Sequence, residues 1–65
     1  MWTIYRWIID DEDSELCGEE FGTELENAGF EEHSNYVLEV FPNENPRCLG
    51  KVSEEEAEMM GLEIY

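Results

Sequence analysis

The chain opens with a segment in which apolar side chains fall on both faces of a predicted strand. Residues Trp2 to Ile9 are rich in aromatic and β-branched side chains, and such runs favour strands. One face would carry Trp2, Ile4 and Ile8, and the other would carry Tyr5, Trp7 and Ile9. A strand that is apolar on both faces is either central in a sheet and covered twice, or has one face that awaits a partner.

The next apolar positions recur at the spacing of a helix. They are Cys17, Phe21, Leu25 and Ala28, which fall on one narrow stripe. Asp13 or Ser14 can cap the free amides ahead of this stripe, and the neighbouring carboxylates suit the positive end of a helix dipole. Gly29 is a natural stop. The pattern therefore predicts a helix that runs from this cap to Ala28.

A strand pair is expected in the second half of the chain. From Asn35 to Phe41 the side chains alternate between two faces, which predicts a second strand. Pro42 to Pro46 has the composition of a turn. Arg47 to Val52 then returns as a third strand, so that the two strands form a hairpin.

The last segment begins with a capping box, in which Ser53 takes the N-cap position and Glu56 stands three residues later. This pair opens a short helix, which carries Ala57, Met59 and Met60 and ends at Gly61. Leu62 to Tyr65 could form a last short strand.

The order of the predicted elements is β-α-β-β-α, with an optional final strand. It indicates a single acidic α+β domain over residues 1–65, in which an antiparallel sheet carries both helices on one face. This small two-layer sandwich is a compressed ferredoxin-like fold. A chain of this length buries only about 60% of the surface that it exposes when unfolded, so the core is thin.

Charge changes this picture most. Eighteen Asp and Glu face three Lys and Arg, which gives a formal net charge of −15. Solubility alone needs a net charge of about 2–8 in a small domain. The hydrophobic content of 42% is too high for a disordered acidic tail, so the chain should fold. Three cations cannot neutralise a run of phosphates, and an anionic membrane would repel the protein, so neither is an expected partner.

No segment resembles a signal peptide, because the start of the chain has no basic region and the apolar stretches are short. We therefore expect a cytoplasmic protein. Its two cysteines, Cys17 and Cys48, are then reduced. Since Cys17 lies on the apolar stripe, it is interpreted as a buried thiol.

The candidate partner-binding surface is acidic. It comprises Asp10, Asp11, Asp13, Glu15, Glu19, Glu20, Glu24 and Glu26. On a helix, glutamates four residues apart are about 6 Å apart along the axis, and phosphates of one DNA strand recur about every 3.4 Å. Such a band could imitate a nucleic-acid backbone. The alternatives are a solvated surface without a partner, or adaptation to high salt.

A second candidate surface is aromatic. Tyr5 and Trp7, with neighbours such as Val37 and Phe41, are expected on the sheet face that lies away from the helices, where aromatic side chains serve as interface anchors. The alternative is that these side chains fill the core. A homodimer through this face would both complete the core and cover the patch.

Metal binding and catalysis find little support in the sequence. Asp11, Asp13 and Glu15 match the first ligands of an EF-hand loop, but Leu16 and Gly22 replace the required Gly and Glu. Cys17, His33 and Cys48 could converge on zinc, yet no pair has the close spacing of a zinc knuckle. No nucleophile has an evident base, and a chain this short leaves little room for a pocket of about 300 Å³. We expect neither a cofactor nor an enzyme.

In size and charge the whole chain resembles the small acidic inhibitors that phages and mobile elements encode, among them anti-CRISPR and anti-restriction proteins. No diagnostic motif carries this resemblance, so no residue takes a role from it. It implies host defence evasion through a basic partner that handles nucleic acid, such as a Cas effector or a restriction enzyme.

Three functions remain as hypotheses. The first is a non-catalytic inhibitor that presents the acidic residues to a basic nucleic-acid-binding groove, by DNA mimicry. The alternative is a protein–protein interaction or assembly module bound through the Tyr5/Trp7 face. The third is a halophilic accessory protein, which would unfold at low salt.

Overall fold

The computed structural model describes residues 1–65, and its elements are three strands and two helices. In chain order they are β1 (Trp2–Ile9), β2 (Glu20–Glu26), α1 (Phe30–Val40), β3 (Pro46–Val52) and α2 (Glu54–Met60). The strands form one antiparallel sheet in the order β2-β1-β3. The predicted class, α+β with an antiparallel sheet and two helices, is confirmed. The order β-β-α-β-α differs from the predicted one, and this is not the predicted ferredoxin-like arrangement.

β1 is the central strand, which explains its two apolar faces. It pairs with β2 from Trp2 opposite Glu26 to Ile8 opposite Glu20. Its pairing with β3 shifts by one residue between Arg6 and Trp7, where a bulge accommodates an extra residue of β3. Of the two options that the sequence left open for this strand, the central position covered on both faces is the one observed.

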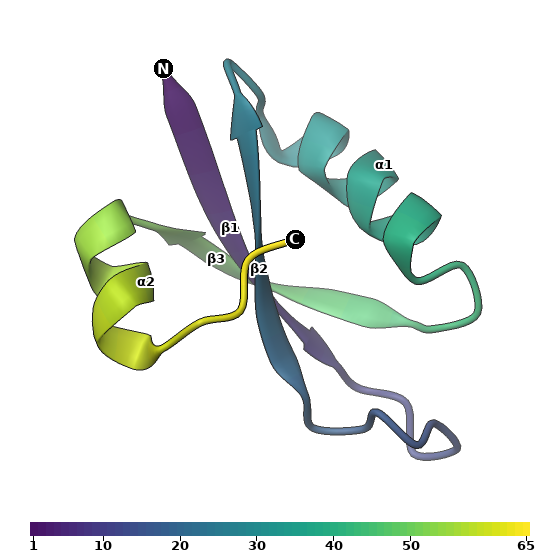
Figure 1. The fold of residues 1–65 in the computed structure, drawn as a ribbon. Helices are drawn as coiled ribbons and strands as arrows, with labels where there is room; N and C mark the ends of the chain where they lie inside the picture. Colours follow the sequence, from purple (N-terminus) through teal and green to yellow (C-terminus); the bar gives the residue numbers. More distant parts are fainter.

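The two helices lie on opposite sides of the sheet, as Figure 1 shows. α1 covers the face with Trp7, Ile9 and Phe21, which form the main core with Val37 of α1. α2 and the residues after it cover the other face, where Ala57 and Leu62 lie beside Ile4. The prediction that both helices lie on one face is therefore wrong. The sheet is the middle layer of a structure that extends 35 × 24 × 15 Å.

The predicted helix up to Ala28 is a connection followed by β2. Residues 10–19 form a series of turns, and β2 then buries Phe21, Gly22 and Thr23 in succession. Cys17 lies in the connection and is exposed, so its interpretation as a buried thiol is wrong. Gly29, which was expected to stop a helix, instead precedes the first turn of α1 as its N-cap.

The predicted strand Asn35–Phe41 is part of α1, so the expected hairpin with Arg47–Val52 does not exist. α1 buries His33 and Val37, which are four residues apart and therefore lie on one helix face. The amide of Gly29 donates a hydrogen bond of 2.6 Å to the carboxylate of Glu32 at the start of the helix.

β1, β3 and α2 appear where the sequence places them. At the start of α2, the Ser53 hydroxyl accepts from the amide of Glu56 at 3.0 Å, and the Glu56 carboxylate accepts from the amide of Ser53 at 3.2 Å. The helix ends at Gly61, whose φ of 64° favours glycine. Neither helix has the length and apolar content to cross a membrane.

The C-terminal tail, residues 62–65, closes the outer edge of β2. The amide of Gly22 donates to the carbonyl of Glu63 at 2.7 Å, and the amide of Tyr65 donates to the carbonyl of Gly22 at 2.9 Å. The expected last strand is thus a single parallel bridge between Gly22 and Ile64. The Tyr65 ring packs against the rings of Phe21 and Phe41.

Candidate functional site

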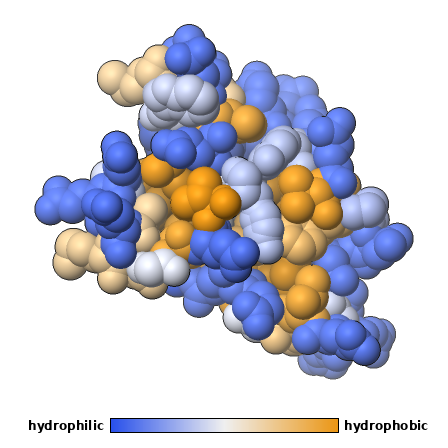
Figure 2. All heavy atoms as spheres, in the orientation of Figure 1, coloured by the Kyte–Doolittle hydropathy of each residue, from blue (hydrophilic) through white to orange (hydrophobic).

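Negative charge on the surface is almost entirely uncompensated. Arg6 pairs with Glu20 on the neighbouring strand, and Arg47 lies 3.6 Å from Asp10. The other sixteen of the eighteen acids make no ion pair. In Figure 2, hydrophilic side chains form most of the outline of the molecule, and the most apolar side chains show in its middle.

The predicted acidic site is divided between the β1–β2 connection and β2. The connection holds Asp10, Asp11, Asp13, Glu15 and Glu19, and the strand holds Glu20, Glu24 and Glu26. These residues therefore do not share a helix face. On β2, Glu24 and Glu26 point to the same side and are about 6.8 Å apart along the strand, at a rise of about 3.4 Å per residue.

The connection is held in shape by its own short side chains. A carboxylate oxygen of Asp11 accepts from the amide of Asp13 at 3.0 Å, and the hydroxyl of Ser14 accepts from the amide of Leu16 at 3.0 Å. The amide of Gly18 donates to the carbonyl of Ile9 at 2.8 Å, which closes the segment against the end of β1. The acids of this segment thus project from an ordered chain of turns.

The aromatic candidates Tyr5 and Trp7 lie beneath α1. Trp7 is only 3% exposed and belongs to the core, and the Tyr5 ring lies 4.4 Å from that of His33. Val37, which was expected beside them on the sheet, is on the helix that covers them. The expectation of a helix-free aromatic face is therefore wrong, and the core interpretation of Trp7 is the one observed.

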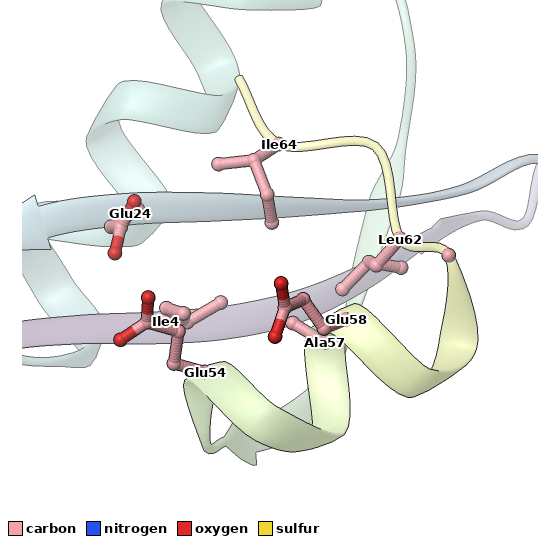
Figure 3. A pocket seen from close by; sticks show the side chains of 8 residues that line it. Ile4, Glu24, Glu54, Ala57, Glu58, Leu62 and Ile64 are labelled. Atoms are coloured by element: carbon pink, nitrogen blue, oxygen red, sulfur yellow. The ribbon is translucent and has the colours of Figure 1, made fainter.

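A groove lies on the opposite face, between the sheet, α2 and the C-terminal tail. Its volume is about 440 Å³, which corrects the expectation that the chain leaves little room for a pocket. Ile4 and Ala57 are buried at its base, and Leu62 and Ile64 of the tail form one side. Figure 3 shows these apolar side chains gathered between α2, the strands and the tail.

Three carboxylates surround this apolar base. Glu24 comes from β2, and Glu54 and Glu58 come from successive turns of α2. In Figure 3 the side chains of Glu54 and Glu58 rise from α2 toward the strands, where Ile4 and Glu24 lie. None of the three makes an ion pair. An apolar base with an anionic rim suits a ligand that is both apolar and cationic.

Trp2 extends this face beyond the groove. It is two residues before Ile4 and therefore points to the same side of β1. It stands opposite Glu26 in the register and is 60% exposed. The face thus presents an aromatic ring next to further negative charge. Sequence reasoning placed Trp2 and Ile4 on one face, but it could not place the tail and α2 over them.

His33 is a buried polar residue whose role the sequence did not reveal. Its Nδ1 lies 2.6 Å from the hydroxyl of Thr23, and its Nε2 lies 2.8 Å from the hydroxyl of Thr3. The indole N–H of Trp7 donates to Thr23 at 3.0 Å, and the Thr3 hydroxyl donates to the carbonyl of Ala28 at 2.7 Å. Every polar group is satisfied if Thr23 donates to Nδ1 and the Nε2–H donates to Thr3.

This hydrogen-bond chain requires a neutral imidazole. Burial lowers the pKa of His33 below its ordinary value of 6.5, against a smaller opposite effect of the nearby Glu32 carboxylate. Its i, i+4 spacing to Val37 was the available signal that it faces a core. His33 is therefore a structural side chain, and its two ring nitrogens are already occupied by hydrogen bonds.

The residues considered for a metal do not converge. Cys17 is exposed in the β1–β2 connection, Cys48 is half-buried on β3, and His33 is held by threonines. No group of three or more His, Cys, Asp or Glu side chains has the geometry of a metal site.

No protein-family model, curated protein or solved structure matches the chain.

Proposed function

We propose that this protein is a non-catalytic binding protein whose acidic surface occupies a basic, nucleic-acid-binding surface of another protein. The observation that carries the proposal is the uncompensated charge: sixteen acids without an ion pair are displayed by an ordered fold of 65 residues. Like-charge repulsion destabilises a compact domain, so this surface is maintained at a cost in stability. A complementary basic surface would offset that repulsion.

The ordered series of acids supports a nucleic-acid-binding partner. Positive grooves that follow a phosphate backbone are lined with Arg and Lys, and their natural ligand is a dense series of negative charges. The β1–β2 connection and β2 offer such a series on ordered backbone, because turn hydrogen bonds hold the connection and the ladder with β1 holds the strand. The proposed mimicry of a nucleic-acid backbone therefore rests on the spacing of carboxylates along β2 and not on their spacing along a helix.

The proposed class of partner includes the Cas effectors and restriction enzymes that the resemblance in size and charge implies. Both kinds of protein bind nucleic acid in positively charged channels. The protein would inhibit them by excluding nucleic acid from the channel.

The proposal is tested by capture from a bacterial lysate with the immobilised protein, washed with rising salt or with duplex DNA. The matched variant carries Asp13→Lys, Glu15→Lys and Glu26→Lys, three exposed positions whose side chains make no hydrogen bond or ion pair. Nucleic-acid-binding proteins should be retained by the wild type, released by DNA, and lost from the variant at lower salt. Retention that neither DNA nor the three reversals change would contradict the proposal.

A further inference from the structure

We infer that the groove between Ile4, α2 and the C-terminal tail is the specific part of this surface, and that it receives an arginine or lysine side chain from a basic segment of the partner. The inference rests on the proposed function and assigns its recognition site. Such a side chain has an aliphatic stem and a charged end, and both parts find a counterpart in the groove.

The stem would lie on the apolar base. Ile4 and Ala57 provide a buried surface at the bottom, and Leu62 and Ile64 provide a wall. Ile64 remains 40% exposed in the free protein, so part of this wall is in contact with water until a ligand covers it. Removing apolar surface from water on both partners favours binding.

The charged end would meet the carboxylates of Glu24, Glu54 and Glu58. No cation of the chain pairs with these carboxylates, since the two ion pairs join Arg6 to Glu20 and Arg47 to Asp10. Carboxylates beside an apolar surface attract a cation more strongly than carboxylates surrounded by water, since the local dielectric constant is lower.

Trp2 and Glu26 provide a second pairing of an apolar surface with a carboxylate, beside the groove. They face each other across the β1–β2 pair, on the side of the groove. An exposed indole ring attracts cations to its face, and arginine stacks on it most readily. A segment with two basic residues could thus occupy the groove with one and cover Trp2 with the other.

The acidic residues of α1 lack this combination of carboxylates and apolar surface. The carboxylates of Glu31 and Glu39 project from α1 on the far side of the sheet and line no groove. They contribute to the long-range field but offer no surface for an aliphatic stem. This difference provides a matched control for the test.

The test is titration of the whole protein with a hexa-arginine peptide at an ionic strength of about 0.15 M, where long-range attraction is largely screened. The double variant Glu54→Gln/Glu58→Gln should weaken binding about tenfold, and Glu31→Gln/Glu39→Gln, with the same change in charge, about twofold. Equal losses of peptide affinity in the two variants would show that the groove is not the recognition site. The proposed function, which depends on charge alone, would not be contradicted by that result. Absence of peptide binding to the wild type would also contradict the groove as a binding site for arginine. The proposed function is tested independently by the lysate capture.

A second pair of variants tests the apolar part. Ile64→Ser removes part of the groove wall, and Met59→Ser is its control on α2, since Met59 is 81% exposed and does not line the groove. Only Ile64→Ser should weaken peptide binding. Chemical-shift changes of the wild type should concentrate at Ile4, Leu62 and the Trp2 indole. Chemical-shift changes spread evenly over all acidic regions of the wild type would contradict the inference. This measurement does not depend on whether the variants fold.

Discussion

Thr23 connects two buried side chains that would otherwise lack partners. Its hydroxyl accepts from the Trp7 indole and lies within 2.6 Å of His33 Nδ1, and the residue itself is fully buried. A buried polar group without a partner costs more than a hydrogen bond contributes. A threonine in an amphipathic strand gives no sign of this role in the sequence, because the partners come from another strand and from α1.

Thr23→Val should therefore destabilise the protein strongly. It leaves the Trp7 N–H and His33 Nδ1 without partners, at about 1–3 kcal/mol for each group. Thr23→Ser keeps the hydroxyl and loses one buried methyl group, at about 0.8 kcal/mol. Urea unfolding of the two variants measures the difference. Equal free energies of unfolding for the two would show that the hydrogen-bond chain has no energetic role.

The buried neutral His33 should make stability depend on pH. Because its pKa is lowered in the folded state, the unfolded chain binds a proton more readily as the pH falls below 6.5. The free energy of unfolding should then decrease toward acid pH, by at most about 1.4 kcal/mol per pH unit for this one proton. The stabilising contribution is present above pH 6.5 and is lost as the pH falls toward the lowered pKa.

Comparison with His33→Gln isolates this effect, because both proteins share the same carboxylates and the same repulsion among them. The stability of the wild type should fall relative to that of the variant between neutral pH and the acid side of pH 6.5. Parallel pH curves for the two proteins would contradict the neutral, buried state of the imidazole.

At the scale of elements, the misassigned helix has a specific cause. Phe21 and Leu25 are four residues apart, and this spacing fits one face of a helix as well as one face of a strand. Asp13 and Ser14 favour helix caps, but such residues also favour Asx and ST turns. The turns formed around Asp11 and Ser14 are of this kind. The sequence is therefore compatible with a helix and with a strand preceded by turns, and packing against β1 selects the strand.

Elements with several agreeing signals were predicted correctly. β1 has its density of aromatic and β-branched residues, and α2 has its capping box and its terminal Gly61. α1 has only the short pattern of His33 and Val37 on its buried side. Of the three carboxylates at the groove, the sequence analysis selected Glu24 but not Glu54 or Glu58. The groove itself was not predicted, because it forms only when α2 and the tail fold back over Ile4 and Glu24.

The tail packs closely over Gly22, which has no side chain. A Cβ atom there would lie 2.6 Å from Cδ1 of Ile64 and 2.9 Å from Cδ2 of Leu62. Gly22→Val should displace the tail from β2, at about 1–3 kcal/mol for an overpacked site. In the wild type, the backbone amide of residue 22 donates to the carbonyl of Glu63. In the Gly22→Val variant this amide would lose its acceptor and exchange rapidly with solvent.

Deletion of residues 63–65 is the matched control, since it exposes the same edge of β2 without adding a side chain. Hydrogen exchange at position 22 should rise to a similar level in both proteins. Continued protection in Gly22→Val would show that the tail tolerates the new side chain and that its packing is not limiting. Both variants should also weaken hexa-arginine binding, because Ile64 leaves the groove.

At the scale of the whole molecule, charge and fold are in opposition. A net charge of −15 repels itself over a body whose longest dimension is 35 Å, and only two ion pairs relieve it. The small core of Trp7, Ile9, Phe21 and Val37 has to overcome this repulsion. In a complex with a basic partner, the same negative charges would be attracted to the partner and would stabilise the complex. We therefore propose that this surface takes the place of a nucleic acid on its partner.

The most direct measurement is competition on a purified partner obtained by capture. Fluorescently labelled DNA is bound to that partner, the protein is added, and anisotropy is followed over a series of salt concentrations. We expect the protein to displace the DNA and the two never to bind together. The inhibition constant, corrected for the affinity of the DNA at each salt concentration, should rise with salt. A ternary complex, or an affinity that does not change with salt, would contradict this proposal.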